Sequence, residues 1–319
     1  MLSRTPLGST DLSVSVLCYG TNMLGSAIDQ ESANAILDRF VELGGNFLDS
    51  ARIYGDWIPG IPAGASERAI GAWMKSRGNR SDLVIATKGG MFDARAGDYR
   101  MRVNPQDIAK DLGESLDHLG TGTIDLYFLH MDDPDVPVQE LIDALAEHQA
   151  AGRIRHYAAS NWAADRIVEA NAYAKSAGKP GFVASETFWG LAKPDVEAAT
   201  RQGYQHYYEG EYEALHETMP IIAYAATSGG YFAMREKGAV ADMLAARYGN
   251  QDNDRRFAAA QELAAEHGVS INEIVLGYLV NQPLQTIPVF GASSPERVEE
   301  GVKAAKVKLS AGELAQLRG

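Results

Sequence analysis

Leu83-Val84-Ile85-Ala86-Thr87 and Asp125-Leu126-Tyr127-Phe128-Leu129 decide the fold of this chain, because each is a short and almost continuous apolar run. Strands that are buried on both faces, as in parallel sheets, have this composition. Each run is followed directly by a titratable residue, Lys88 in the first case and His130 in the second. Such a residue is costly at the end of a buried strand unless it has a partner or a task. We therefore expect chemistry at these strand ends.

Similar runs recur along the chain and alternate with helical patterns. The eight predicted strands are 16–19, 46–48, 83–87, 125–129, 156–159, 182–185, 221–224 and 286–289. Between them, Asn104-Pro105 is typical of a helix start and Gly120 of a helix end. Alternating strands and helices predict an α/β fold with a parallel sheet, and eight repeats predict a (β/α)8 TIM barrel. We expect one domain over residues 1–319, with an N-terminal β-hairpin (2–14) that caps the bottom of the barrel.

Three loops are longer than a barrel needs, 55–65, 89–103 and 192–219. Each follows a predicted strand, so we expect all three on the C-terminal face. Barrel enzymes place their active sites on that face.

The composition excludes several classes of protein. The 319 residues carry a formal net charge of −13, which argues against nucleic acid or an anionic membrane surface as a partner. Cys18 is the single cysteine, so no internal disulfide forms, and burial in a strand is its ordinary role. With no secretory pattern at the start and no apolar run of ~20 residues, we expect a cytoplasmic protein without a membrane span. The oligomeric state is left open.

Four residues at or beyond neighbouring strand ends can converge on one barrel face: Asp49, Tyr54, Lys88 and His130. A tyrosine has a reference pKa of ~10. A nearby ammonium favours the phenolate, so Lys88 is expected to make Tyr54 a readier proton donor to a carbonyl. Asp49 would hold Lys88, and His130 would orient the carbonyl or share in proton transfer. The alternative is a Lys–Asp pair that stabilises the barrel end, with the other two as bystanders.

Five segments, in this order and over nearly the whole chain, together resemble the aldo-keto reductase family. They are GGNFLDSARIYG (44–55), ATK (86–88), IDLYFLH (124–130), ASN (159–161) and IPVFGASSPERVEE (287–300). The resemblance implies that NADPH lies across the top of the barrel and passes a hydride to an aldehyde or ketone. Tyr54 would be the acid, with Asp49, Lys88 and His130 as its partners.

The resemblance also implies a set of cofactor-binding residues. Ser160 and Asn161 match positions that hold the nicotinamide amide, and Tyr224 matches the aromatic residue that stacks on the nicotinamide ring. Asp49 belongs to the cofactor site as well as to the catalytic set. Gly20, Thr21 and Asn22 match neighbours of the cofactor.

At the adenosine end, Ser294-Pro295 is typical of a helix start, which is a natural phosphate site. Arg297 could pair with a 2′-phosphate, with Ser293 and Ser294 as hydroxyl donors. Glu300 could orient Arg297 or approach the adenine. The alternative is a solvated helix start with an ordinary surface arginine.

Four positions depart from the family pattern. Glu186 replaces the usual glutamine; it can accept from the carboxamide but adds negative charge. Ala225 replaces a common serine. Gly291, itself within the cofactor segment, stands where some members carry a phosphate-binding lysine, and Gly301 where many carry asparagine. These departures weaken the NADPH assignment and leave NADH use open.

Aromatic residues are expected to build the substrate pocket around His130. They are Trp57, Phe92, Trp162, Trp189 and Tyr207 or Tyr208. Asp132 and Asp133 could bind hydroxyl groups of a sugar or polyol, or could cap the following helix. Because the chain stops soon after its last predicted helix (311–317), we expect an open site. His206 could line the substrate loop or lie exposed in it.

Other chemistries have weaker support. No Gly-x-Gly-x-x-Gly fingerprint and no metal-ligand spacing is present, so we expect neither a Rossmann site nor a catalytic metal. A Schiff-base lyase that uses Lys88 would need a lowered lysine pKa, which Asp49 opposes. A non-catalytic regulatory subunit that binds the cofactor would keep the fold without turnover.

Overall fold

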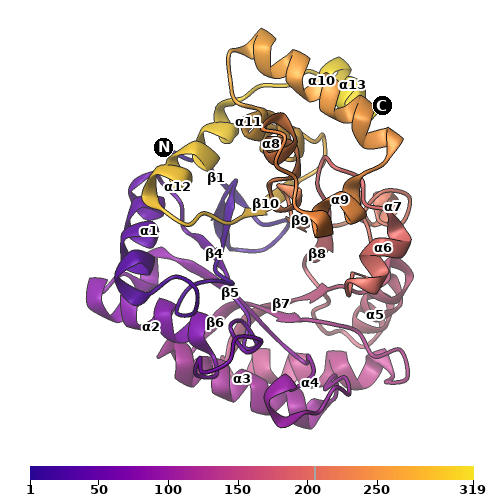
Figure 1. Ribbon diagram of the computed structural model, residues 1–319. Helices are drawn as coiled ribbons and strands as arrows, with labels where there is room; N and C mark the ends of the chain where they lie inside the picture. The colour runs from indigo at the N-terminus through magenta and orange to yellow at the C-terminus, as the bar shows by residue number, and fades with distance from the viewer. Residues whose placement is uncertain (205) are drawn as a thin grey trace.

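The computed structural model describes residues 1–204 and 206–319, and it shows eight parallel strands closed into a barrel with helices outside (Figure 1). The order round the barrel is β10, β3, β4, β5, β6, β7, β8, β9. Their bounds are β3 Cys18–Gly20, β4 Phe47–Asp49, β5 Val84–Gly89, β6 Ile124–Leu129, β7 Ile154–Ser160, β8 Ser185–Phe188, β9 Ile221–Tyr224 and β10 Thr286–Phe290. The prediction of a (β/α)8 barrel is confirmed.

The helices lie around the barrel and along the chain between its strands (Figure 1). They are α1 Gln30–Glu42, α2 Ala65–Arg77, α3 Pro105–Leu119, α4 Val138–Ala150, α5 Ala164–Ser176, α6 Val196–Arg201, α7 Glu213–His216, α8 Tyr231–Glu236, α9 Asp242–Tyr248, α10 Gln251–His267, α11 Ile271–Val280, α12 Pro295–Lys303 and α13 Ala311–Arg318. No described helix is both long and apolar enough to cross a membrane.

Local sequence signals set several helix ends, and those of α3 lie where they were predicted. The Asn104 side chain accepts a hydrogen bond from the Asp107 amide at 3.0 Å, with Pro105 as the first residue of α3. The same helix ends at Gly120, whose φ of 63° suits a residue without Cβ. Ser270 and Glu273 form a capping box at the start of α11.

The predicted N-terminal hairpin is confirmed and closes one end of the barrel. β1 (Arg4–Pro6) pairs antiparallel with β2 (Ser13–Ser15). Leu7, Leu12 and Val14 of this segment are buried in one apolar cluster with Phe47 and Leu126. That cluster takes side chains from every barrel strand or the residue beside it, so it fills the barrel interior.

The sixth barrel strand lies further along the chain than its hydropathy predicts. The prediction was 182–185, whereas β8 spans Ser185–Phe188. Glu186 and Thr187 belong to the strand and are 3% and 1% exposed. The Thr187 hydroxyl lies 2.8 Å from that of Ser185, and the Glu186 carboxyl group lies 3.3 Å from the Lys88 ammonium. The apolar run that predicted this strand (182–185) therefore ends before β8 itself ends at Phe188.

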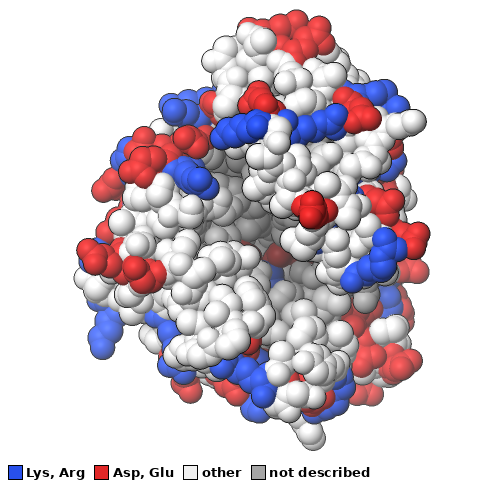
Figure 2. Space-filling view, in the orientation of Figure 1, with Lys and Arg blue, Asp and Glu red and all other residues white. Residues whose placement is uncertain are grey.

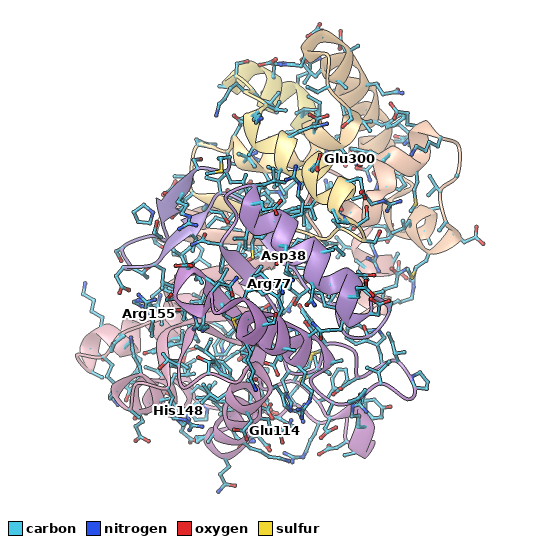
Figure 3. The ribbon with its side chains drawn as sticks, turned by 90° about the vertical axis from the view of Figure 1, so that its left-hand side faces the viewer. Asp38, Arg77, Glu114, His148, Arg155 and Glu300 are labelled. Carbon is cyan, nitrogen blue, oxygen red and sulfur yellow. The ribbon has the colours of Figure 1, made fainter. Side chains whose placement is uncertain are left out.

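A second, larger apolar cluster lies between the barrel and its helices. Outside it, ion pairs connect neighbouring helices. Arg77 of α2 contacts Asp38 of α1 at 2.7 Å, and both lie on the face shown in Figure 3. Asp38 also accepts from the buried Trp73 indole at 2.7 Å, so the pair helps to seat α2 against α1.

We expect Leu126→Ala to destabilise the protein by about 2–5 kcal/mol, because it leaves a cavity in the barrel interior where Leu126 is fully buried. Urea unfolding followed by circular dichroism measures this change. Val168→Ala is the control, since Val168 is 56% exposed. Equal effects of the two substitutions would contradict the interior placement of Leu126.

Candidate active site

Four predicted residues meet at the C-terminal ends of β4, β5 and β6. The Lys88 ammonium donates to the Asp49 carboxylate, to the Ser50 carbonyl at 3.0 Å and to the Tyr54 hydroxyl at 3.2 Å. The Tyr54 hydroxyl also approaches Asp49 Oδ2 at 3.5 Å. The His130 ring centroid lies 6.0 Å from that of Tyr54. Figure 2 shows a hollow above the barrel with acidic and basic atoms inside it.

The strand register explains why these residues meet. Asp49 pairs with Ala86 across β4 and β5, and Lys88 follows Ala86 by two residues on the same side of β5. Ala86 belongs to the interior cluster, so Lys88 also points into the barrel. Lys88 is 0% and Asp49 3% exposed, which makes the pair a buried one.

The charges in this cluster favour an ammonium and a neutral phenol. Burial alone would lower the pKa of Lys88, but Asp49, Glu186 and Tyr54 outweigh it and raise that pKa well above its usual value. Burial raises the pKa of Tyr54 as well, although Lys88 opposes the rise. Lys88 acts on the phenol in the expected direction, but desolvation is the larger effect, so the net shift of the Tyr54 pKa is upward.

His130 is a neutral imidazole in this setting. Burial, followed by the charge of Lys88, lowers the pKa of His130 well below its usual value. Its Nδ1 atom is buried and has no hydrogen-bond partner among the described residues. A neutral imidazole can donate one hydrogen bond, which favours an orienting role over proton transfer.

Glu186 contacts Lys88, which the sequence did not predict. It was predicted to accept from a cofactor carboxamide, but its Oε2 lies 3.3 Å from Lys88 Nζ. Lys88 therefore has two buried carboxyl groups beside it. Burial and the charge of Asp49 raise the pKa of Glu186 to about 8, against the opposing effect of Lys88.

The Thr21 side chain supports the backbone of the cluster. It is 0% exposed, and its hydroxyl donates to the Asp49 carbonyl at 2.8 Å. The same hydroxyl lies 2.7 Å from that of Ser66, which in turn lies 2.9 Å from the Ser50 hydroxyl. These bonds fix the backbone of Asp49 and Ser50.

A hydrogen-bonded chain connects the fourth, fifth and seventh barrel strands. Asn161 donates to the His130 carbonyl at 3.0 Å and to the Ser160 hydroxyl at 3.1 Å, and it accepts from the Tyr224 hydroxyl at 2.6 Å. Asn161 adopts a φ of 56°, an uncommon conformation for a residue with Cβ. Backbone strain of this kind is concentrated at functional sites.

The Tyr224 ring belongs to an aromatic stack. The Phe188 and Tyr224 centroids lie 5.7 Å apart, and the Phe188 and Tyr204 centroids 4.6 Å apart. The Arg247 guanidinium covers Tyr204 at 4.2 Å from its centroid. The loop 192–219 thus packs against the residue predicted to stack on nicotinamide, a contact that the sequence did not indicate.

A cavity of about 220 Å³ lies between the ends of β3 and β10. Its lining contains five residues predicted to bind the cofactor: Gly20, Asn22, Gly291, Ser293 and Arg297. Ser294 caps α12 as predicted, since its hydroxyl accepts from the Arg297 amide at 3.4 Å. Arg297 and Glu300 are exposed, and Figure 3 shows Glu300 on α12.

The two glycine departures have different surroundings. A Cβ at Gly291 would meet only the Gly20 carbonyl, at 3.9 Å, so a side chain fits there. A Cβ at Gly301 would lie 2.5 Å from the Phe290 ring, which is closer than atoms can pack. Phe290 thus fills the space that a side chain at position 301 would need.

Some of the predicted substrate residues lie at the mouth of the barrel, and others are buried in the core. Trp57 is 52% exposed, and its ring lies 6.2 Å from that of Tyr54. Phe92 is partly buried and pairs with the exposed Tyr99 at 5.7 Å. All three side chains belong to loops 55–65 and 89–103.

Trp162 and Trp189 do not line the mouth, so both predictions are corrected. Trp162 is 0% exposed and donates to the Met131 carbonyl at 3.0 Å. Trp189 is 1% exposed and stacks on Tyr208 with 3.6 Å between centroids. Large aromatic side chains fill cores as readily as pockets.

Asp132 is also held in place by another residue. It pairs with Arg166 of α5 at 3.1 Å, whereas Asp133 accepts from the Asp135 amide at 3.1 Å. His206 pairs with Glu211 at 3.1 Å and is partly buried. No group of three His, Cys, Asp or Glu side chains suited to a metal ion occurs in the described part of the chain.

Sequence reasoning missed a buried ionic network behind the loop 89–103. Asp111 accepts from the Gly90 amide at 2.9 Å and from Arg102 at 2.6 Å, and it lies 3.2 Å from Arg52. Arg52 stands two residues before Tyr54 and also contacts Glu114 at 2.6 Å. The position of Arg52 inside the segment 44–55 was the available signal.

The loop after β9 was missed as well. Ala225 and Ser228 have φ values of 55° and 52°, and Gly229 and Gly230 follow with 66° and 81°. The Ser228 amide donates to the Ala225 carbonyl at 2.7 Å and the Gly230 amide to the Thr227 carbonyl at 2.8 Å, so this loop consists of tight turns. The Gly-Gly pair was the signal in the sequence.

Comparison with known proteins places these features in a family. The model of the Aldo/keto reductase family matches residues 16–319. Norsolorinic acid reductase stcV of Emericella nidulans is 29% identical over 318 residues, which cover 95% of this chain and 77% of that protein. Aldo-keto reductase ausK of the same organism is 30% identical over 92% of this chain and 73% of its own length. An oxidoreductase of Bacillus subtilis, YrpG, is 28% identical over 97% and 92%.

We expect Gly301→Asn to destabilise the protein by about 1–3 kcal/mol through overpacking against Phe290. Asparagine is the better helix former of the two, so helix propensity works in the opposite direction. Thermal unfolding measures the change. A Cβ at Gly122 meets nothing within 4 Å, so Gly122→Asn is the control. Phe290→Ala is itself costly because Phe290 is buried, so the comparison is a double-mutant cycle: Gly301→Asn should cost less in the Phe290→Ala background than in the parent. A single variant as stable as the parent would contradict this account.

Proposed function

Because the chain belongs to the aldo/keto reductase family and is an NAD(P)H-dependent oxidoreductase, we propose that it reduces an aldehyde or ketone with NADPH and with Tyr54 as the general acid. The observation that carries the proposal is the buried Lys88, which donates to both Asp49 and Tyr54. An ion pair between Lys88 and Asp49 would be enough to stabilise the end of the barrel. It would not require the partly exposed Tyr54 hydroxyl as a further partner of Lys88.

The chemistry of the four residues follows from their charges. Tyr54 keeps its proton at neutral pH, as an ordinary phenol does, and burial raises its pKa further. A substrate oxygen that gains negative charge becomes basic enough to take that proton. Lys88 then stabilises the phenolate that remains, and Asp49 keeps the ammonium in place. The neutral His130 donates a hydrogen bond that orients the carbonyl.

Several features fit a nicotinamide cofactor, which supplies a hydride when it is bound. The cavity of about 220 Å³ has the first turn of α12 and Arg297 at its side, and a helix N-terminus favours a phosphate. Arg297 would bind the 2′-phosphate of NADPH. Ser160, Asn161 and Tyr224 would hold the nicotinamide end.

The mouth supports a substrate with a flat apolar face. The exposed Trp57 lies beside the acid, and its ring can cover either an aromatic ring or the C–H face of a sugar. A sugar or polyol-related substrate was predicted in part from Asp132, but Arg166 holds that carboxylate. Five of the relatives are named norsolorinic acid reductases. We therefore propose a carbonyl substrate with an apolar face before a sugar.

The two alternative functions, a Schiff-base lyase and a regulatory subunit, have less support. A Schiff-base lyase needs an unprotonated lysine, whereas the pKa of Lys88 is raised well above its usual value. A regulatory subunit would bind the cofactor without turnover on any carbonyl.

Tyr54→Phe should lower kcat on the order of 10²–10⁴-fold, because it removes the acid and keeps the ring. NADPH binding, followed by nicotinamide fluorescence, should stay within a factor of two to three, as is about typical for a change that removes no ligand contact. Tyr99→Phe is the control, since Tyr99 is 70% exposed. Unchanged turnover in Tyr54→Phe would refute the assignment of the acid.

Arg297→Met should weaken NADPH binding on the order of ten- to hundredfold and leave NADH binding nearly unchanged, because only NADPH carries the 2′-phosphate. Fluorescence titration of each cofactor measures both constants. Arg201→Met, at an exposed arginine of α6, is the control. An equal loss for the two cofactors would mean that Arg297 does not recognise the phosphate.

A further inference from the structure

Two carboxyl groups compete for one buried ammonium in the barrel mouth. Asp49 comes from β4 and Glu186 from β8, on opposite sides of Lys88 in the strand order. The three side chains are 4%, 3% and 0% exposed. With all three ionised, the cluster would carry one negative charge without water to stabilise it, and such clusters take up a proton instead.

The hydrogen bonds indicate which carboxyl group takes up the proton. Asp49 accepts from Lys88 and lies within reach of the Tyr54 hydroxyl. Glu186 Oε2 is near Lys88, but it has no hydrogen-bond partner among the described residues. A carboxylate is stabilised by the hydrogen bonds that it accepts, so Asp49 is the better anion and Glu186 the better acid.

The remaining titratable groups that face Glu186 are neutral. They are the Cys18 thiol of β3, the Tyr54 phenol after β4 and the Tyr224 phenol of β9. Burial raises the pKa of each of the three. The charge of the cluster therefore depends on Asp49, Lys88 and Glu186.

We propose that Glu186 is a positioning residue that carries a proton at neutral pH and so keeps the charge of the Asp49–Lys88 pair at zero. This inference rests on the proposed function of Tyr54 as the acid. When Glu186 ionises, Lys88 is shared between two carboxylates. The added negative charge makes the phenol harder to deprotonate and opposes negative charge on the substrate oxygen.

The glutamate thereby gives the reductase a pH response that a glutamine could not give. Around neutral pH the protonated carboxyl group is uncharged and can both donate and accept a hydrogen bond, as an amide can. Above the pKa of Glu186, about 8, it becomes an anion that can only accept. The effect acts on Tyr54, so it should appear in kcat more than in KM.

The first test is a titration of the protein without cofactor. Carbon-13 NMR of protein labelled at the glutamate carboxyl carbons follows each glutamate separately, and Glu186→Gln identifies the signal by its loss. We expect a midpoint near the pKa of about 8. In Asp49→Asn the midpoint should fall by more than about one unit, because Lys88 then has one carboxylate partner. A Glu186 that ionises in the ordinary carboxylate range would overturn the proposal.

The second test is the pH profile of turnover. Between about pH 7 and about pH 9, kcat of the parent enzyme should fall on the order of tenfold, and kcat of Glu186→Gln should stay flat over this range. Glu140→Gln, at an exposed position of α4, has the same charge change and should follow the parent. An unchanged alkaline fall in Glu186→Gln would overturn the proposal. If no carbonyl is reduced at all, the proposed function fails, and the NMR midpoint still decides the protonation of Glu186.

Discussion

The buried charge of Lys88 is the constraint on which the site depends. An ammonium without exposed surface carries a desolvation cost of several kcal/mol. The structure offsets this cost with partners from separate elements: a carboxylate at the end of β4, a backbone carbonyl beyond it and a phenol in the next loop. Each partner must reach the same atom, so the register of β4 against β5 and the path of the loop 55–65 are fixed together. Thr21 and Ser66 complete this arrangement from β3 and α2.

Much of this arrangement could be predicted from the sequence because several local signals mark the same strands and helices. Apolar runs mark the strands, and Asn104, Gly120 and Ser270 mark helix ends by the conformations that they favour. Parallel strands place their C-terminal ends together, so residues at those ends could be assigned to one face. Asp49, Tyr54, Lys88 and His130 meet for this reason.

The predictions that failed concern contacts between distant segments. Composition does not say whether Trp162 faces solvent or a core, because an indole suits both. The contact of Glu186 with Lys88 was missed because it depends on the arrangement of the whole barrel, which the local sequence does not contain; the cofactor contact expected of Glu186 from the family resemblance stays a prediction. The acidity of Tyr54 was misjudged in the same way: the neighbouring charge was visible in the sequence, but the extent of burial was not.

The contact between Phe290 and Gly301 restricts how this chain could have diverged. A side chain at position 301 requires the Phe290 ring to shift, and a smaller residue at position 290 leaves a void while the glycine remains. Either change alone costs stability, whereas a joint change at both positions can keep the space filled. The residue tolerated at one of these positions therefore depends on the residue at the other.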